Sequence, residues 1–546
     1  MLSSPGWHSS VLGQHRRTRG HSPSALIAQC NAAGVPQKDP VNKKLLYLVN
    51  PSNPVVSSTK TSESRWNRYK IWKPLGLLVL AGMTPPEWEI AIIDENLGIP
   101  DYSAMRRPDL VGITAFTSQA GRAYEIADGF RTRGVPVVMG GIHATMCLDE
   151  ASAYVDSVVT GEAESIWPRV LDDARAGSLK PLYSGERLGL DQVPLARHDL
   201  LPSGYQFGSI QISRGCPLNC SFCSVTAFNG GEFRVRPTAM IIEELKLIKE
   251  NYVLVVDDNL IGTNKGHAER VKELFRAMIH EKVNKKWFTQ VTINMADDEE
   301  LLELAARSGC VAVYIGFETT SREGLKELNK RFNLSRVSDY AGAVRRIRRH
   351  GILVVGSFIM GLDVDGPGIG REIAESAISY DVDLLNLTYM TPLPGTRLWD
   401  EMKSTDRIAA NRFPVDWKYY NLVFPVAHYN NLSWEDMIRE NLECNRLFYS
   451  YRNIAKRVAQ NVWHRREPFG TLVASLSYRN NAIRNFHGKF ADLDLSRGQS
   501  VSQQRSRTAT TALPAPAVFA HRPRPDWPIN PPVTVDVTPV VERSPS

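Results

Sequence analysis

Three cysteines on one short stretch are the residues of this chain best suited to carry chemistry. They are Cys216, Cys220 and Cys223 in Arg214-Gly-Cys-Pro-Leu-Asn-Cys-Ser-Phe-Cys223, four and three residues apart. Three thiolates at that spacing can hold three corners of an iron–sulfur cube and leave the fourth iron open to another ligand. A cluster that only carries electrons is normally held by four cysteines. The spacing therefore predicts a cluster that takes part in a reaction.

A structural zinc site and ordinary buried thiols are the alternative interpretations of the same cysteines. A closed zinc site needs a fourth ligand, and neither a nearby His nor a second Cys pair follows the stretch. The remaining cysteines are scattered singly, and we expect them to be small core or tail residues. These are Cys30, Cys147, Cys310 and Cys444.

The cysteine stretch resembles the signature of the radical S-adenosylmethionine (radical SAM) superfamily, a CxxxCxxC loop with an aromatic residue, here Phe222, before the last cysteine. Arg234-Val-Arg-Pro237, a helix-like stretch at 240–249 and an apolar run ending in Asp257-Asp-Asn259 follow. The resemblance implies that the three cysteines bind a [4Fe-4S] cluster and that its open iron binds S-adenosylmethionine (SAM). Reductive cleavage of SAM would yield a 5′-deoxyadenosyl radical in a site that excludes water.

Repeated strands and helices at 205–400 are consistent with the partial (β/α) barrel of this superfamily, whose reactive groups lie at the carboxyl ends of the strands. We expect strands at 210–213, 253–257, 288–293, 312–317, 354–360 and 384–389. The resemblance implies that Asp257 and Glu318, the latter in Gly316-Phe-Glu318, contact bound SAM. A capped or solvated strand end is the alternative for either acid. The loop at 391–396 contains two prolines and is expected to shape the end of the barrel.

Short apolar strands alternate with helical stretches over residues 45–190, which predicts a doubly wound, Rossmann-like parallel sheet. Strands are expected at 45–50, 89–94, 110–114, 136–140 and 157–160, with helices at 122–133 and 166–176. Ligands of such a sheet bind at the carboxyl ends of its strands. The loops at those ends begin at Asn50, Asp94, Thr114, Gly140 and Thr160.

Glycines at two neighbouring strand ends would permit a bulky ligand to approach the backbone closely. Placed directly before a radical SAM loop, these strand ends resemble the cobalamin (B12)-binding domain of one large radical SAM subgroup. The resemblance implies contacts with cobalamin from Gly140, Gly141, His143, Gly161 and Glu162. For His143, a structural role in the loop is an equal alternative.

The loop after the first strand departs from one familiar cobalamin pattern. Proteins that give cobalt a lower histidine ligand carry Asp-x-His-x-x-Gly there, whereas this loop reads Asn50-Pro-Ser-Asn-Pro54. The cobalt should therefore lack that histidine ligand.

Charge and composition distinguish the ends of the chain from its body. Residues 1–44 carry +5 and residues 496–546 carry +3 of the net charge of +7, which leaves −1 on the body. Both ends are polar, and we expect a disordered arm and a disordered tail. A nearly neutral body argues against a nucleic-acid partner. Residues 401–495 are expected to form a mostly helical appendage whose aromatic residues belong to a core.

The expected location is the cytoplasm. No apolar stretch reaches the length of a transmembrane span, and no apolar segment follows the first arginines. An odd, sparse set of seven cysteines indicates a reducing compartment. An organellar transit peptide within residues 1–44 is the alternative.

The two resemblances together imply an α/β enzyme that joins cobalamin to radical chemistry. The leading hypothesis is transfer of a cobalamin-borne methyl group to an unactivated carbon of a small-molecule or lipid substrate. Oxidative cyclisation or rearrangement without methyl transfer is an alternative, because relatives with the same two domains perform such reactions. A non-catalytic iron–sulfur binding module is another. The reaction would need an electron donor such as flavodoxin or ferredoxin, and the sequence identifies no further catalytic side chain.

Overall fold

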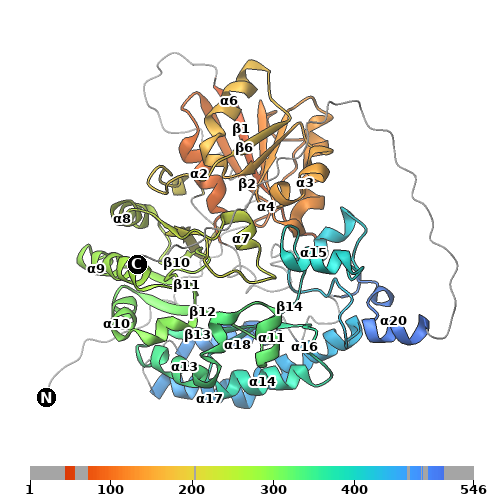
Figure 1. Cartoon of the computed structure of the whole chain (residues 1–546). Coiled ribbons are helices and arrows are strands. Elements are labelled where there is room, and N and C mark those ends of the chain that lie inside the picture. Colours follow the sequence, from red (N-terminus) through yellow and green to blue (C-terminus); the bar gives the residue numbers. More distant parts are fainter. Residues whose placement is uncertain are drawn as a thin grey trace, which may run out of the picture.

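The computed structural model describes residues 43–55, 72–201, 204–463, 468–480, 483 and 490–508. The expected disordered arm lies outside this part of the chain except for its last two residues, and so does the expected tail beyond residue 508. Two parallel sheets of six strands each dominate the structure, with the N-terminal sheet above the second one in Figure 1. The predicted α/β class is confirmed.

The N-terminal sheet has the strand order β2-β1-β3-β4-β5-β6, and all of its strands are parallel. Its strands are β1 (Lys44–Asn50), β2 (Trp88–Asp94), β3 (Leu110–Thr114), β4 (Val137–Gly140), β5 (Ser157–Gly161) and β6 (Leu182–Gly185). Residues 45–49 of β1 are all buried because helices cover both faces of the sheet. The strand order reverses direction between β1 and β3, and such switch points are where doubly wound sheets bind ligands.

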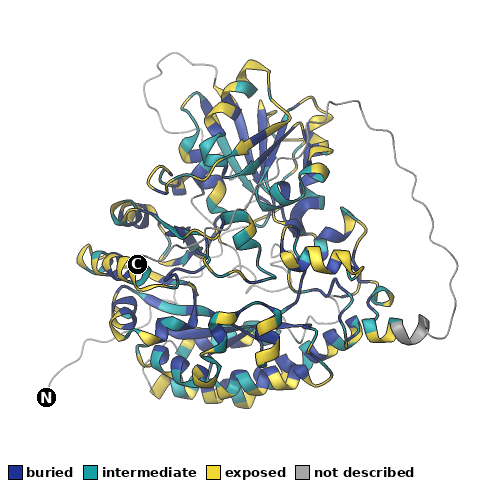
Figure 2. Cartoon of the chain, viewed as in Figure 1, coloured by how far each residue is buried: buried dark blue, intermediate teal, exposed yellow. Residues whose placement is uncertain are grey.

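Helices α2 (Leu75–Met83) and α6 (Trp167–Ala176) pack on one face of this sheet, with Leu46 and Leu48 of β1 in their core. Helix α3 (Ala120–Arg131) packs on the other face, against Tyr47 and Val49. Alternate side chains of β1 thus pack into two separate hydrophobic cores, one on each face of the sheet. Figure 2 shows the buried strands between helices whose outer faces are exposed.

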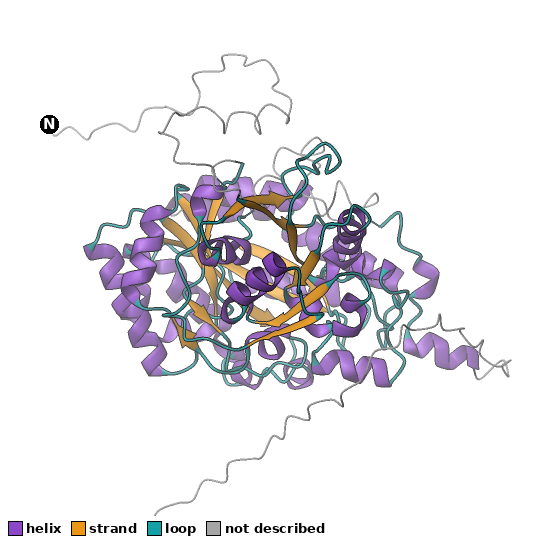
Figure 3. Ribbon diagram, turned by 90° about the horizontal axis from the view of Figure 1, so that it is seen from above, coloured by secondary structure: helices purple, strands orange, loops and turns teal. Residues whose placement is uncertain are grey.

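The second sheet keeps its strands in chain order, β7-β10-β11-β12-β13-β14, and β7 and β14 form its two edges. The strands are β7 (Phe207–Ile210), β10 (Tyr252–Val255), β11 (Lys286–Val291), β12 (Cys310–Glu318), β13 (Leu353–Met360) and β14 (Leu384–Tyr389). The helices connecting them include α8 (Thr238–Leu247), α9 (Lys265–His280), α10 (Glu299–Arg307), α13 (Tyr340–Arg349) and α14 (Ile369–Ser379). This is the predicted partial barrel, and Figure 3 shows helices around its strands. The strand expected at 210–213 is instead divided, because β7 ends at Ile210 and a separate two-residue strand follows.

The C-terminal region is mostly helical, as predicted, and contains α15 (Arg397–Ser404), α16 (Trp434–Phe448), α17 (Tyr451–Trp463) and α18 (Pro468–Arg479). The Tyr449 hydroxyl donates to the Leu385 carbonyl at 2.8 Å and accepts from the Leu385 N–H at 3.0 Å. It therefore supplies hydrogen-bond partners to backbone groups at the edge of β14 that no further strand covers. No helix in the described ranges is both long and apolar enough to cross a bilayer.

The start of the predicted disordered tail, at residue 496, is wrong. Gly498 accepts a backbone hydrogen bond from Trp434 at 2.8 Å, and the Val501 N–H donates to the Tyr429 carbonyl at 2.9 Å. Helix α20 (Val501–Thr508) follows. Backbone groups hold this short segment, so the composition of its side chains gave no sign of it.

Candidate active site

The three cysteines lie on a loop that leaves the carboxyl end of β7. A short hairpin closes this loop, in which β8 (Ser213–Arg214) pairs antiparallel with β9 (Arg234–Val235). Gly215 has φ +88°, and a Cβ there would lie 2.0 Å from the Glu232 carbonyl oxygen, so only glycine fits. Cys223 caps α7 (Ser224–Asn229). The hairpin and α7 therefore fix both ends of what we call the cysteine loop, residues 215–223.

In the cysteine loop Cys220 is buried, Cys216 and Cys223 are half-buried, and none of the three forms a disulfide. The pKa of Cys220 is raised to about 11, chiefly by burial and to a smaller extent by Glu318 and Cys216, against the opposing charge of Lys330. Burial likewise raises the pKa of Cys223 to about 12, with further contributions from Cys220 and Cys216. Burial therefore disfavours the charged thiolate form of Cys220 and Cys223.

Within the described ranges, no three His, Cys, Asp or Glu side chains are close enough to share a single metal ion. An iron–sulfur cube keeps its thiolate ligands further apart than a tetrahedral zinc ion does. The donor set, three cysteine thiols on one loop, fits a cluster with one open iron.

Two barrel segments hold the outer half of the cysteine loop. The Ser221 N–H donates to the Leu328 carbonyl at 3.1 Å, and the Leu398 N–H donates to the Ser221 carbonyl at 3.0 Å. The side chains of Asn329 and Arg397 donate to the Asn219 carbonyl at 2.6 and 2.5 Å. Hydrogen bonds with the barrel therefore hold the outer half of the cysteine loop.

Asp257, expected to contact SAM, is fully buried beneath this loop. Its carboxylate accepts from the Ile212 N–H at 2.7 Å and from the Ser213 hydroxyl at 2.5 Å. Burial raises the pKa of Asp257 to about 7. Because both oxygens are engaged with the strand that leads into the cysteine loop, the geometry favours a positioning role over contact with a ligand.

Glu318, the second acid expected to contact SAM, forms a buried ion pair with Lys330. A Cβ at Gly316 would lie 2.2 Å from Glu318 Oε1 and 2.7 Å from Lys330 Nζ, so the pair packs directly over the end of β12. Burial would lower the pKa of Lys330, but the charges of Glu318 and Cys220 outweigh it and raise that pKa. A carboxylate and an ammonium group beside Cys220 match the charged amine and carboxylate of a methionyl group.

Sequence reasoning missed Lys330. The residue lies twelve positions after Glu318, beyond a helix, and no local pattern links the two. A basic residue after an acidic strand end is a common arrangement, so only the fold identifies this one.

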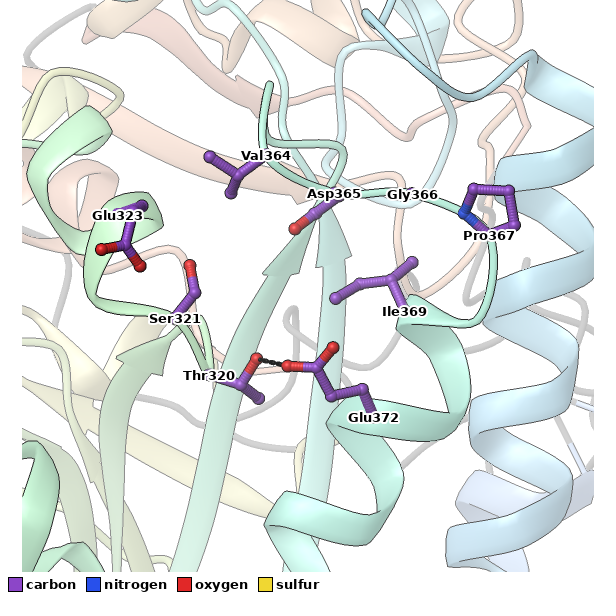
Figure 4. Close-up of a pocket in the computed structure, with 9 residues that line it drawn as sticks. All are labelled: Thr320, Ser321, Glu323, Val364, Asp365, Gly366, Pro367, Ile369 and Glu372. Carbon is purple, nitrogen blue, oxygen red and sulfur yellow. Dashed lines mark hydrogen bonds between the residues drawn. The ribbon is translucent and has the colours of Figure 1, made fainter.

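A cavity of about 300 Å³ lies beside the ends of β12 and β13, and Figure 4 shows the side chains around it. It is lined by Thr320, Ser321, Glu323, Val364, Asp365, Gly366, Pro367, Ile369 and Glu372. Thr320 donates a hydrogen bond to Glu372 across it. None of the site residues predicted from the sequence lines this cavity.

On the N-terminal sheet, the two loop glycines are required by the chain itself. Gly141 has φ +90°, and its Cβ would lie 2.7 Å from Thr114 Oγ1. Gly161 has φ +70°, and its Cβ would lie 2.4 Å from the Gly185 carbonyl oxygen. Gly140 has only ordinary contacts. The position of an added Cβ at Gly141 and at Gly161 is thus already occupied by neighbouring strand-end residues, so the packing of the chain itself requires glycine at both positions.

His143 is completely buried in α4 (Ile142–Met146), and its ring is held by the chain. Its Nε2 lies 2.9 Å from the Tyr124 hydroxyl and 3.4 Å from Glu150. Trp417 of the C-terminal region packs edge-on against the ring and donates to Glu150 at 2.8 Å. These contacts favour the structural alternative for His143.

The loop after β1 contains no histidine and is tied down from two sides. The Ser52 N–H donates to Glu95 at 3.0 Å, and the Gln119 side chain donates to the Pro51 carbonyl at 2.5 Å. At the neighbouring end of β3, Phe116 is 67% exposed. An uncovered aromatic ring beside small strand-end residues fits a large, partly apolar macrocycle such as cobalamin.

Glu162, the last predicted cobalamin residue, faces the cysteine loop. It forms ion pairs with Arg214 and Arg234 of the β8–β9 hairpin. Burial would raise the pKa of Glu162, but the hydrogen bond from Arg234 and the charge of Arg214 hold it below its usual value. The carboxyl edge of the N-terminal sheet thus contacts the loop that carries the cysteines.

Comparison with known proteins gives two domain matches and several relatives that align over most of their length. Residues 210–406 match the radical SAM superfamily, and residues 66–171 match the B12 binding domain. Two relatives from Chlorobaculum tepidum are bacteriochlorophyllide d methyltransferases. The C-12(1)-methyltransferase is 29% identical and the alignment covers 70% of this chain and 84% of the relative. The C-8(2)-methyltransferase is 30% identical, with coverage of 64% and 80%.

The hopanoid C-2 methylase of Rhodopseudomonas palustris is 28% identical, and the alignment covers 66% of this chain and 70% of the relative. Among solved structures, the radical SAM methyltransferase TsrM from Kitasatospora setae, with cobalamin and a [4Fe-4S] cluster bound, has a TM-score of 0.53 at 19% identity. That alignment covers 68% of this chain and 79% of TsrM, and the likeness is one of fold.

Proposed function

We propose that this chain, which belongs to the radical SAM superfamily and also carries a B12-binding domain, methylates a carbon atom of its substrate. In this proposal the substrate is large, polycyclic and mostly apolar. The chain is a cobalamin-dependent radical SAM enzyme whose cofactors are a [4Fe-4S] cluster, SAM and cobalamin. Methyltransferases among its relatives support transfer of a methyl group.

The contact between the two strand-end regions carries this proposal. The loop after β5 reaches the β8–β9 hairpin through Glu162, and α4, after β4, lies close to the loop at 391–396, since a Cβ at Gly395 would lie 2.3 Å from Met146 Sδ. Two sheets that bind ligands at their carboxyl ends therefore direct those ends toward one another. A methyl donor and a radical source both need access to one substrate carbon, and this arrangement supports such shared access.

When bound, the cluster supplies the electron that cleaves SAM, and cobalamin supplies the methyl group. In this proposal Cys216, Cys220 and Cys223 bind the cluster. Lys330 and Glu318 orient the charged end of SAM beside it. Buried Asp257 holds the strand that precedes the cysteine loop, and the hydrogen bonds to Asn219 and Ser221 keep that loop in place. These contacts limit the positions that the three cysteines can take.

An aromatic cluster supports the assignment of an apolar substrate. Trp399 lies two residues after Arg397, which anchors the cysteine loop, and its ring is 5.7 Å from that of Trp417. Phe413 stacks on Trp417 at 3.7 Å. Trp399 and Phe413 are only partly buried. Bacteriochlorophyllides and hopanoids, named for the relatives, are both polycyclic and rich in hydrocarbon, and partly exposed aromatic rings suit such molecules.

The proposal is tested by anaerobic reconstitution with iron, sulfide and hydroxocobalamin, followed by incubation with a reductant and SAM carrying a deuterated methyl group. Flavodoxin or ferredoxin would be the natural type of reductant. Three substrates are compared by mass spectrometry: bacteriochlorophyllide d, a hopanoid and free tryptophan as a small control. We expect labelled methyl in a polycyclic product together with 5′-deoxyadenosine.

Other results would overturn parts of the proposal. Methylation of tryptophan alone would refute the substrate class. Formation of 5′-deoxyadenosine with a changed substrate but no label would indicate cyclisation or rearrangement. Absence of SAM cleavage with a full cluster would refute the radical reaction itself.

A further inference from the structure

We propose that a buried cluster of four charges sets the position of the cysteine loop relative to the cobalamin loops, and that it acts as a positioning device for methyl transfer. The charge cluster consists of Glu162, Glu164, Arg214 and Arg234. This inference rests on the proposed function, because it concerns how the two cofactor sites of one enzyme are held together.

The charge cluster joins the loop after β5 to the β8–β9 hairpin through side chains that are almost completely buried. Glu162 lies 3.1 Å from Arg234 and 3.3 Å from Arg214, measured from its Oε2 to Nη1 of each arginine. A second contact joins Glu162 to Arg234, and Arg214 also pairs with Glu164. The four side chains are between 5% and 11% exposed. Charged hydrogen bonds at this depth are strong and directional.

The two arginines face each other across the hairpin that opens the cysteine loop. Arg214 and Arg234 are register partners in the antiparallel pair β8–β9. Like charges directly opposite one another destabilise a pair of strands. Glu162 contacts both arginines, so a residue of the N-terminal sheet neutralises the repulsion in the hairpin. Because Arg214 is two residues before Cys216, the position of the first thiol depends on a carboxylate that follows β5 of the N-terminal sheet.

The opposite end of the connection is equally rigid. The Gly161 N–H donates to Thr145 of α4 at 3.2 Å, and the positive φ of Gly161 packs the loop against Gly185. These are the strand-end loops expected to contact cobalamin. A movement of Glu162 would therefore move Gly161 with it.

The connector between the two sheets binds the same charges. The Leu188 N–H donates to Glu162 at 3.2 Å, and Arg234 donates to the Leu188 carbonyl at 2.7 Å. Three chain segments thus meet at one carboxylate.

Stability alone does not account for the charge cluster. Burying ions costs solvation, and apolar side chains of similar size would hold the segments together at least as well. What ions add is a defined geometry, since removal of one partner leaves the others with unsatisfied charge. The geometry defined here is the offset between two cofactor loops.

Glu162→Gln tests the proposal in the full-length reconstituted protein, because it keeps the shape of the side chain and removes its charge. The first readout is electron paramagnetic resonance of reduced cluster together with cob(II)alamin, whose magnetic interaction depends steeply on their separation. The second readout is the amount of methylated product formed per 5′-deoxyadenosine. Iron and cobalamin contents are measured in the same samples.

We expect Glu162→Gln to bind both cofactors but to show a weaker magnetic interaction between cluster and cob(II)alamin, with a broader distribution of strengths. The amount of methylated product per 5′-deoxyadenosine should fall by about tenfold to a hundredfold. Glu164→Gln removes one contact to Arg214 only and should cause a smaller change of the same kind. The double variant Glu162→Gln/Arg234→Gln removes the repulsion as well as the attraction and should recover part of the interaction.

The matched control is Glu250→Gln. Glu250 pairs with Lys73 at 2.9 Å, and this buried pair also joins the N-terminal region to the barrel, but beside the amino-terminal ends of the barrel strands. It should leave the magnetic interaction and the product ratio unchanged. Equal signals and ratios in wild type, Glu162→Gln and Glu164→Gln would overturn the positioning role while the proposed function stood. A wild-type protein that methylates without retaining cobalamin would overturn it as well.

Discussion

The cysteine loop and the loops of the N-terminal sheet both lie at the carboxyl ends of parallel strands, but their predicted site residues differ in what they contact. The three thiols of the cysteine loop form no disulfide and lie on one short loop. In the N-terminal loops, His143 and Glu162 are held by other side chains, and Gly141 is packed against Thr114. Where a cofactor is held by donor atoms of the protein, those atoms must be free of other contacts within the chain. A cofactor held by the shape of its site requires loops that are already fixed by their own contacts.

Cys220→Ala should have the largest effect, and it tests whether the cysteine loop holds its cofactor through donor atoms. Removal of one of three ligands should reduce cluster iron and 5′-deoxyadenosine to the background level, while cobalamin binding persists. Anaerobic iron analysis and chromatography after addition of SAM and dithionite measure this. Cys444→Ala removes an equally buried thiol from α16 and should keep both signals. Undiminished 5′-deoxyadenosine in Cys220→Ala would refute the ligand assignment.

Lys330→Gln should have the next largest effect, because it leaves Glu318 buried without its cation. A hydrogen bond to a charged group contributes about 1.5–3 kcal/mol, so the KM for SAM should rise about tenfold to a hundredfold at unchanged cluster content. Lys330→Arg should restore part of the affinity.

Lys272→Gln is the control for this substitution, since Lys272 is also buried and ion-paired but lies on the barrel helices. A rise in KM in both variants would indicate general damage to the barrel, and no rise in Lys330→Gln would remove Lys330 from the SAM site.

These regions also differ in how far the sequence predicted them. The cysteine spacing is local, so the chain order alone identified Cys216, Cys220 and Cys223 as one group. The strands were recognisable because each buried strand is a short apolar run between turns. The partners of Glu162 and Glu318 come from other segments, and neither Arg234 nor Lys330 is close to its partner in the chain. The Glu162 pair depends on how the N-terminal domain meets the hairpin, and the Glu318 pair on how the chain returns over the end of β12, and local patterns encode neither.

Gly141→Ala tests whether the cobalamin side depends on a fixed loop. The alanine would have to keep φ +90°, and its Cβ would lie 2.7 Å from Thr114 Oγ1. We therefore expect the free energy of unfolding to fall by about 1–3 kcal/mol. Less cobalamin should bind, while cluster iron is retained. Denaturant unfolding and the cobalamin absorbance measure both.

Gly129→Ala provides a control of opposite sign. Gly129 lies inside α3, and a Cβ there would have no atom within 4 Å, so alanine should add about 0.5–1 kcal/mol of stability. Full cobalamin occupancy in Gly141→Ala would show that this loop does not need its present shape to bind the cofactor.

The smallest and most selective effect is expected at His143, where the structural and ligand alternatives predict different spectra. Nε2 is bonded to Tyr124, whereas Nδ1 has no hydrogen-bond partner in the described part of the chain. His143→Ala should lower the free energy of unfolding by about 1–3 kcal/mol, because a buried polar contact is lost. His143→Gln places an amide nitrogen near the position of Nε2 and should recover more stability than His143→Asn, which mimics Nδ1. Throughout the series, the visible spectrum of bound cobalamin should stay the same. A spectral shift common to all three variants would mean that the ring contacts the cofactor, and His143 would then join the cysteines as a residue whose donor atom is kept for a ligand.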